Sequence, residues 1–305
     1  MKHAPLVTIL LAALGAPARG EEATRLQFHW PDHLHCEVER RMRTTFGDRP
    51  GPIGDRIDRY QLEATRERGG WMIRRSYLGG VDRRSAGESA ARQWQKADRL
   101  LPFRVRGDGS FAGTVVDKVT RERLRAREAD VAAHGLMPPQ GLPYADSEKQ
   151  LAARARGEWM DLVGDWRGGA LAAGVPLERE ARRQLPLPGL NAAPVKVRER
   201  RELTGRVPCT DGGPATCVAL ESVTEADPTS LDRVLTAAQR TWELAGGRPE
   251  AQGEGLAGLE SRKTLITDSH TLVPSRLTKT METQFKGGGR STIEETTTFA
   301  CTAAP

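Results

Sequence analysis

Several residue types are scarce in this sequence, and each shortage narrows what the protein can be. Hydrophobic residues make up 38% of the 305-residue chain and aromatic residues 5%, so we expect a modest core and plentiful loops. Catalytic signatures are missing as well. The chain has no G-x-S-x-G and no H-E-x-x-H, and the glycines of residues 246–258 lack the Lys-Ser/Thr of a phosphate-binding loop. We therefore expect a protein that is not an enzyme and that uses no cofactor.

The charge pattern excludes a further class of partner. The formal net charge is +6, the cations are mostly arginine, and Asn191 is the only asparagine. This bias is typical of a GC-rich bacterial genome. Arginines are interspersed with acidic residues along the whole chain, so no basic face forms and we expect no nucleic-acid partner.

Long apolar runs are confined to the beginning of the chain. Residues 6–14 are apolar but too few to span a bilayer, Lys2 precedes them, and Ala18 and Gly20 sit where a signal peptidase would read small residues before Glu21. This pattern predicts a signal peptide, and the rest of the chain contains no transmembrane segment.

The expected domain organisation follows from that cut. Residues 1–20 are predicted to be the signal peptide and residues 21–305 a single β-rich domain, with two halves, 21–190 and 191–305, as the other possibility. We expect the mature protein to be exported, to the periplasm or outside the cell.

Only four cysteines are present, and in an exported protein they predict two disulfides, for which three pairings are possible. Cys209 and Cys217 flank a turn-like loop and are expected to close it. That leaves Cys36 to pair with Cys301, which would tie the first strand of the mature chain to the last.

Period-two alternation predicts strands over much of the chain. In residues 34–44, Leu34, Cys36 and Val38 share one face, and the residues between them are charged or polar. From Leu277 onward, Lys279 and Met281 fall on one face in the same way. Further strands are predicted at residues 57–65, 71–78, 101–105, 110–116, 175–181, 195–207 and 216–224, with three in a row between 259 and 302.

Period-three and period-four spacing predicts helices between these strands, at residues 85–99, 146–166 and 228–242. Residues 120–134 are charged and alanine-rich, which predicts a further helix. Short turns between neighbouring strands favour antiparallel pairing. The predicted fold class is therefore α+β: a large curved antiparallel β-sheet, half-barrel-like, with three to four helices packed on it.

Two kinds of candidate site remain. Tryptophans on the predicted helices could line a groove for an apolar ligand, or else fill the core and leave no cavity; they are Trp94, Trp159, Trp166 and Trp242. His33, His35 and Glu37 share the outward face of a strand, with His29 and Asp32 nearby, and form a weak candidate for a surface metal site.

Two segments resemble a known family. Residues 268–277, DSHTLVPSRL, resemble a strand–turn–strand segment of the LolA-like half-barrel lipoprotein carriers of the bacterial envelope and of related uncharacterised secreted proteins. Residues 101–111, LPFRVRGDGSF, resemble a hairpin of the latter. The resemblance implies a curved antiparallel sheet with helices in its mouth, and a role in lipid or lipoprotein handling.

These observations lead to one expected function and one alternative. We expect an exported non-enzymatic protein that binds an apolar ligand, a lipid or an envelope component on its curved sheet. The alternative is a structural or protein-interaction module with no ligand cavity.

Overall fold

The structure is a computed structural model. It describes residues 23–47, 52, 54–82, 100–134, 148–183, 194–210, 213–214, 216–244 and 256–303. The predicted signal peptide and the predicted helix at 85–99, with Trp94, lie outside these ranges. In α2, α3 and α4 the side chains of residues 127–134, 149–150 and 238–244 are also outside the description, and Trp242 is one of them.

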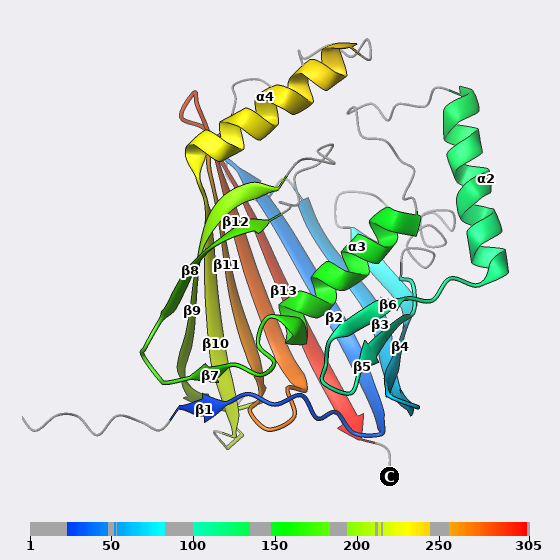
Figure 1. Ribbon diagram of the computed structural model, residues 1–305, viewed down its shortest axis with the longest axis vertical. Helices are drawn as coiled ribbons and strands as arrows, with labels where there is room; N and C mark the ends of the chain where they lie inside the picture. Colours follow the sequence, from blue (N-terminus) through cyan, green and yellow to red (C-terminus); the bar gives the residue numbers. More distant parts are fainter. Residues whose placement is uncertain are drawn as a thin grey trace, which may run out of the picture.

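One large antiparallel sheet dominates the fold (Figure 1). It has eleven strands in the order β6-β5-β4-β3-β2-β13-β12-β11-β10-β9-β8, and its two ends do not join. Strands from both predicted halves of the chain belong to this single sheet. The expectation of a mostly antiparallel β protein with helices is confirmed. The strand bounds are β2 (His33–Phe46), β3 (Gly54–Glu67), β4 (Gly70–Asp82), β5 (Phe103–Arg106), β6 (Phe111–Thr114), β8 (Leu177–Arg183), β9 (Val195–Val207), β10 (Cys217–Ala226), β11 (Leu256–Asp268), β12 (Pro274–Phe285) and β13 (Arg290–Ala303).

A seam between the first and last long strands joins the two halves of the open sheet. All other neighbours in the sheet are consecutive in the chain, whereas β2 pairs with β13 across almost its whole length. Cys36 lies directly opposite Cys301 in this register, and the two form a disulfide. The second disulfide joins Cys209 to Cys217 between β9 and β10. Both predicted pairings are confirmed.

Three α-helices are present in the described part of the chain: α2 (Lys118–His134), α3 (Glu148–Trp159) and α4 (Pro228–Leu244). α4 begins where expected, because the Asp227 carboxylate accepts a hydrogen bond from the backbone N–H of Ser230 at 2.7 Å. α3 crosses one face of the sheet (Figure 1). No helix among the described residues is long and apolar enough to cross a membrane.

The long helix predicted at 146–166 is interrupted. After Trp159 the chain widens into a five-residue π-helix, η1 (Met160–Gly164), and the N–H of Asp165 donates to the carbonyl of Met160 five residues back. The apolar stripe that predicted a continuous helix is compatible with either winding, so the change at Met160 could not be read from periodicity.

The segment that leads into β2 closes one end of the core. It contains β1 (Thr24–Arg25), which pairs with β7 (Ala170–Leu171) in a separate two-stranded sheet that was not predicted from the sequence. The N–H of Leu26 donates to the Gly169 carbonyl at 2.9 Å. Strands of two residues carry too little alternation to be predicted.

Aromatic rings fill the core at this end. Trp159 contacts the rings of Trp30, Phe28 and Phe103 with centroid distances of 5.2, 5.6 and 5.8 Å. Three buried indoles donate their N–H to carbonyl oxygens: Trp30 to Leu272 at 3.1 Å, Trp71 to Pro31 at 3.0 Å and Trp159 to Gly109 at 2.8 Å. The core therefore combines apolar burial with satisfied polar atoms.

Candidate functional site

The face of the sheet that carries Cys36 and Cys301 changes character along its strands. On β12, Leu277 is buried in the core, Lys279 follows two residues later, and Met281 two residues after that. On β13, Glu295 lies between Phe299, in the same core, and Ile293. The inner face is thus apolar near the disulfide, charged in the middle and apolar again further along.

The charged middle is aligned across five neighbouring strands. Glu295, Lys279, Lys263, Ser222 and Arg201 are directly paired in sequence from β13 through β12, β11 and β10 to β9. Like charges directly opposite each other destabilise a sheet, and Lys263 lies opposite Lys279. This row needs counter-charges from elsewhere in the fold.

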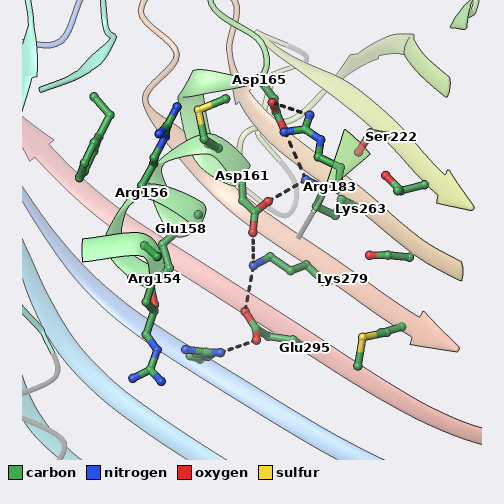
Figure 2. Close-up of a pocket in the computed structure, with 18 of the residues that line it drawn as sticks. Arg154, Arg156, Glu158, Asp161, Asp165, Arg183, Ser222, Lys263, Lys279 and Glu295 are labelled. Atoms are coloured by element: carbon green, nitrogen blue, oxygen red, sulfur yellow. Dashed lines mark hydrogen bonds and ion pairs between the residues drawn. The ribbon is translucent and has the colours of Figure 1, made fainter. Parts of the chain in front are cut away.

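The π-helix supplies those counter-charges (Figure 2). Asp161 of η1 reaches both lysines, with its two oxygens 2.7 Å from the Lys263 Nζ and 2.6 Å from the Lys279 Nζ. Asp165, directly after η1, lies 3.1 Å from Arg201 and 3.6 Å from Lys263. Asp165 also lies 3.4 Å from Arg183 of β8, so one short segment neutralises cations from four strands.

Two further carboxylates complete the network at its ends. Glu295 pairs with Arg40 of β2 at 2.6 Å and lies 3.7 Å from Lys279. Glu199 of β9 accepts from Arg179 at 2.7 Å and from Arg183 of the edge strand β8. Ion pairs thus connect β2 to β8 along the inner face.

The pKa values follow from burial and neighbouring charge. Burial alone would raise the pKa of Asp161, but the charges of Lys263 and Lys279 outweigh it and hold that pKa below its usual range. Burial alone would lower the pKa of Lys279, but Asp161 and Glu295 outweigh it and raise that pKa. Both groups are therefore ionised at neutral pH.

A large cavity lies between this charged row and α3–η1. It has a volume of about 1350 Å³, is open to solvent, and is lined by residues from every strand of the large sheet except β5. Its lining contains nine basic and six acidic side chains, an excess of three positive charges. An apolar wall formed by Met42, Met281 and Ile293 borders the charged row.

Comparison with known protein families and with curated proteins gives no match. The chemistry of the cavity therefore has to be read from its own residues.

Of the tryptophans predicted to line a groove, the two whose side chains the structure describes do not line this cavity. Trp159 and Trp166 are 1% and 3% exposed and belong to the packed core beneath it. Their large apolar surfaces are buried against β-strand residues and other rings. For these two, the alternative that tryptophans fill the core is the one observed; the side chains of Trp94 and Trp242 lie outside the described residues.

The candidate metal residues are not brought together. His35 lies 3.8 Å from Glu63 on the neighbouring strand, and His33 and Glu37 are exposed two residues away on either side. Among the residues that the structure describes, no group of three His, Cys, Asp or Glu side chains could hold a metal ion.

Sequence reasoning missed the charged row. A signal was available, because Lys279 shares the inward phase of Leu277 and Met281, and Glu295 shares that of Ile293 and Phe299. Alternation assigns a residue to a face without revealing whether that face is packed or borders a cavity. Asp161 and Lys279 are also 118 positions apart, beyond any local pattern.

Acid is expected to destabilise the protein through Glu199. Burial alone would raise the pKa of Glu199, but the guanidinium groups of Arg183 and Arg179 outweigh it and lower it to about 2, from 4.5 for an unperturbed glutamate. Because the folded-state pKa is the lower one, this stabilisation is present above pH 4.5 and is lost as the pH falls toward 2.

Urea denaturation measured between pH 6 and pH 2 would test this. The wild type should lose on the order of 2–3 kcal/mol from this group over that interval. Glu199→Gln should be less stable at pH 6 and should lose correspondingly less on acidification. Equal losses in the two proteins would contradict the assignment.

Proposed function

We propose that the protein is an exported, non-enzymatic binding protein whose sheet acts as a half-barrel around an amphipathic ligand, a lipid or another envelope component. The observation that carries the proposal is the cavity of about 1350 Å³ beneath α3–η1. Pockets for small ligands usually measure about 300–1,000 Å³, so this volume is sufficient for a lipid-sized molecule.

The lining argues for an amphipathic ligand rather than a wholly apolar one. The apolar wall of Met42, Met281 and Ile293 suits an alkyl chain, and the excess of basic side chains suits an acidic head group. An entirely apolar molecule would leave the charged row facing hydrocarbon, which is unfavourable. The initial expectation of an apolar ligand is therefore narrowed to a ligand with both characters.

Two other features support the remaining parts of the proposal. Disulfides persist in oxidising compartments, so the Cys36–Cys301 and Cys209–Cys217 bonds favour export. The carboxylates Asp161 and Glu199 are held ionised by paired cations, which suits structural or binding roles better than proton transfer at neutral pH. The proposed half-barrel is also what the resemblance carried by residues 268–277 implies.

Lipid analysis tests the proposal directly. The protein would be purified from the periplasm or medium of a bacterial host without detergent, and bound molecules extracted and identified by mass spectrometry. We expect an acidic amphiphile enriched well above its share of the host lipids. A purified protein that carries no amphiphile and binds none on titration would favour the structural or interaction module without a ligand.

A matched pair of variants places the ligand in the cavity. Ile293→Trp narrows the apolar wall and should weaken binding of a fluorescent fatty acid by about tenfold or more. Thr292→Trp adds the same side chain one residue away on the opposite face of β13 and should bind as the wild type does. Equal affinities in the two variants would place the ligand elsewhere.

A further inference from the structure

The charged row of the inner face has the composition of an anion site. Without the contribution of η1, the sheet presents five basic side chains on this row and beside it, against only two acidic ones, Glu295 and Glu199. The basic side chains are Arg40, Lys279, Lys263, Arg201 and Arg183. The sheet alone is thus matched to an acidic group that it does not itself supply.

Asp161 and Asp165 fill that role in the present structure. Asp161 lies on η1 and Asp165 directly follows it. Both carboxylates form ion pairs with cations of the sheet. A π-helix is rare and often marks a functional position, since it costs stability relative to an α-helix. Here it begins at Met160, immediately before the carboxylate that bridges the two lysines.

Exposure distinguishes the two ends of the row. Asp161 and Lys279 are each 23% exposed and line the cavity, whereas Glu199, at the other end, is 4% exposed. An acidic group that enters the cavity can therefore reach the Lys279 ammonium beside a part-exposed carboxylate, whereas at the other end the carboxylate of Glu199 is buried and only its partner Arg183, 33% exposed, faces the cavity. Exchange of one carboxylate for another is feasible at Asp161.

The apolar wall lies beside the end of the charged row that contains Asp161 and Lys279. Met281 lies two residues beyond Lys279 on β12, and Ile293 lies two residues before Glu295 on β13, so both follow the charged row on the same face. Met281 and Ile293 are directly paired. An acidic group at Lys279 would therefore place an attached alkyl chain along this wall.

We infer that Lys263 and Lys279 form the head-group site for an acidic amphiphile, and that the Asp161 carboxylate is an internal occupant which the ligand's acid group displaces. The inference rests on the proposed function and adds the chemistry of recognition: a carboxylate or phosphate head on an alkyl chain. Displacement requires only that the Asp161 side chain withdraws, because Trp159 and Val163 keep η1 packed on the core.

The test compares acidic and neutral ligands of the same chain length. Affinities of the mature protein for dodecanoate, dodecyl phosphate and methyl dodecanoate would be measured for the wild type and for Asp161→Asn. Removing the competing charge should tighten binding of the acidic ligands by about tenfold and leave the methyl ester unchanged. The two acidic ligands distinguish a carboxylate from a phosphate head group.

Two further variants control the result. Asp232→Asn removes a carboxylate from a surface pair with Lys286, at 2.6 Å and outside the cavity, and should change no affinity. Lys279→Met removes the cation and should weaken binding of the acidic ligands by about tenfold without affecting the ester. This variant decides the question if Asp161→Asn does not fold.

The outcomes separate the inference from the proposed function. If all three ligands bind but Asp161→Asn and Lys279→Met leave the preference for acid unchanged, the head-group site is wrong and the binding protein stands. If no ligand binds to any of the folded proteins, both are wrong. If the acidic ligands bind more tightly to Asp161→Asn and to none of the other variants, the result supports the displacement of Asp161.

Discussion

Replacing Trp159 with alanine is expected to lower the free energy of unfolding by about 3–5 kcal/mol, the range for a large buried aromatic side chain. Trp159 is 1% exposed, its ring contacts those of Trp30, Phe28 and Phe103, and its N–H donates to the Gly109 carbonyl. The substitution would leave a cavity and an unpaired carbonyl where the helix, the hairpin and the N-terminal segment meet.

The same substitution should also change ligand binding. Trp159 immediately precedes η1, so loosening it also loosens the placement of Asp161 against Lys263 and Lys279. We therefore expect altered ligand binding even at temperatures where the variant is folded.

Urea denaturation and ligand titration measure these two effects. The matched control is Trp159→Phe, which keeps most of the buried ring but loses the hydrogen bond to Gly109, and should lose only about 1–2 kcal/mol. A loss below about 1 kcal/mol for Trp159→Ala would contradict the role of this residue as the centre of the core.

Removing the Cys36–Cys301 disulfide is the second change with a large expected effect. The two cysteines are 265 residues apart in sequence, so the bond restricts nearly the whole unfolded chain. In the chain-entropy description a loop of this size stabilises the folded state by about 5–6 kcal/mol. The double variant Cys36→Ala/Cys301→Ala should show that loss in thermal or urea denaturation.

The second disulfide provides the control for this prediction. Cys209 and Cys217 are only 8 residues apart, and the same description gives about 2–3 kcal/mol for so short a loop. Cys209→Ala/Cys217→Ala should therefore be the milder double variant. The opposite order would show that the seam does not depend on its disulfide for stability.

The long strands were predictable because each one alternates over many residues. In β2, Leu34, Cys36 and Val38 are buried while Glu37 is exposed, as period two requires. The same phase directed Cys36 and Cys301 inward, which is why their pairing could be anticipated. Helix α4 was predictable from its cap and its stripe of Leu231 and Val234.

The site was not predictable, because its parts come from distant segments. Lys263, Lys279 and Glu295 become neighbours only through the register of three strands, and Asp161 reaches them from a helix more than a hundred residues away. Hydrophobic pattern also favoured the tryptophans as candidates, yet Trp159 and Trp166 are buried in the core. About half of the groups that face the cavity are charged residues, whose polarity alone favours a position in solvent.

The order of strands also determines what an incomplete chain can do. Every pairing in the large sheet except β2–β13 joins strands that are consecutive in the chain. The two runs of strands, β2 to β6 and β8 to β13, can therefore each pair as they are synthesised. The outer edge of β2 has no partner until residues 290–303 have been made. An unpaired edge is a template for pairing with another chain. A product that stops short of β13 would expose two further edges, on the long strands β2 and β12, which the complete chain pairs with β13; the complete sheet keeps only its outer edges on β6 and β8.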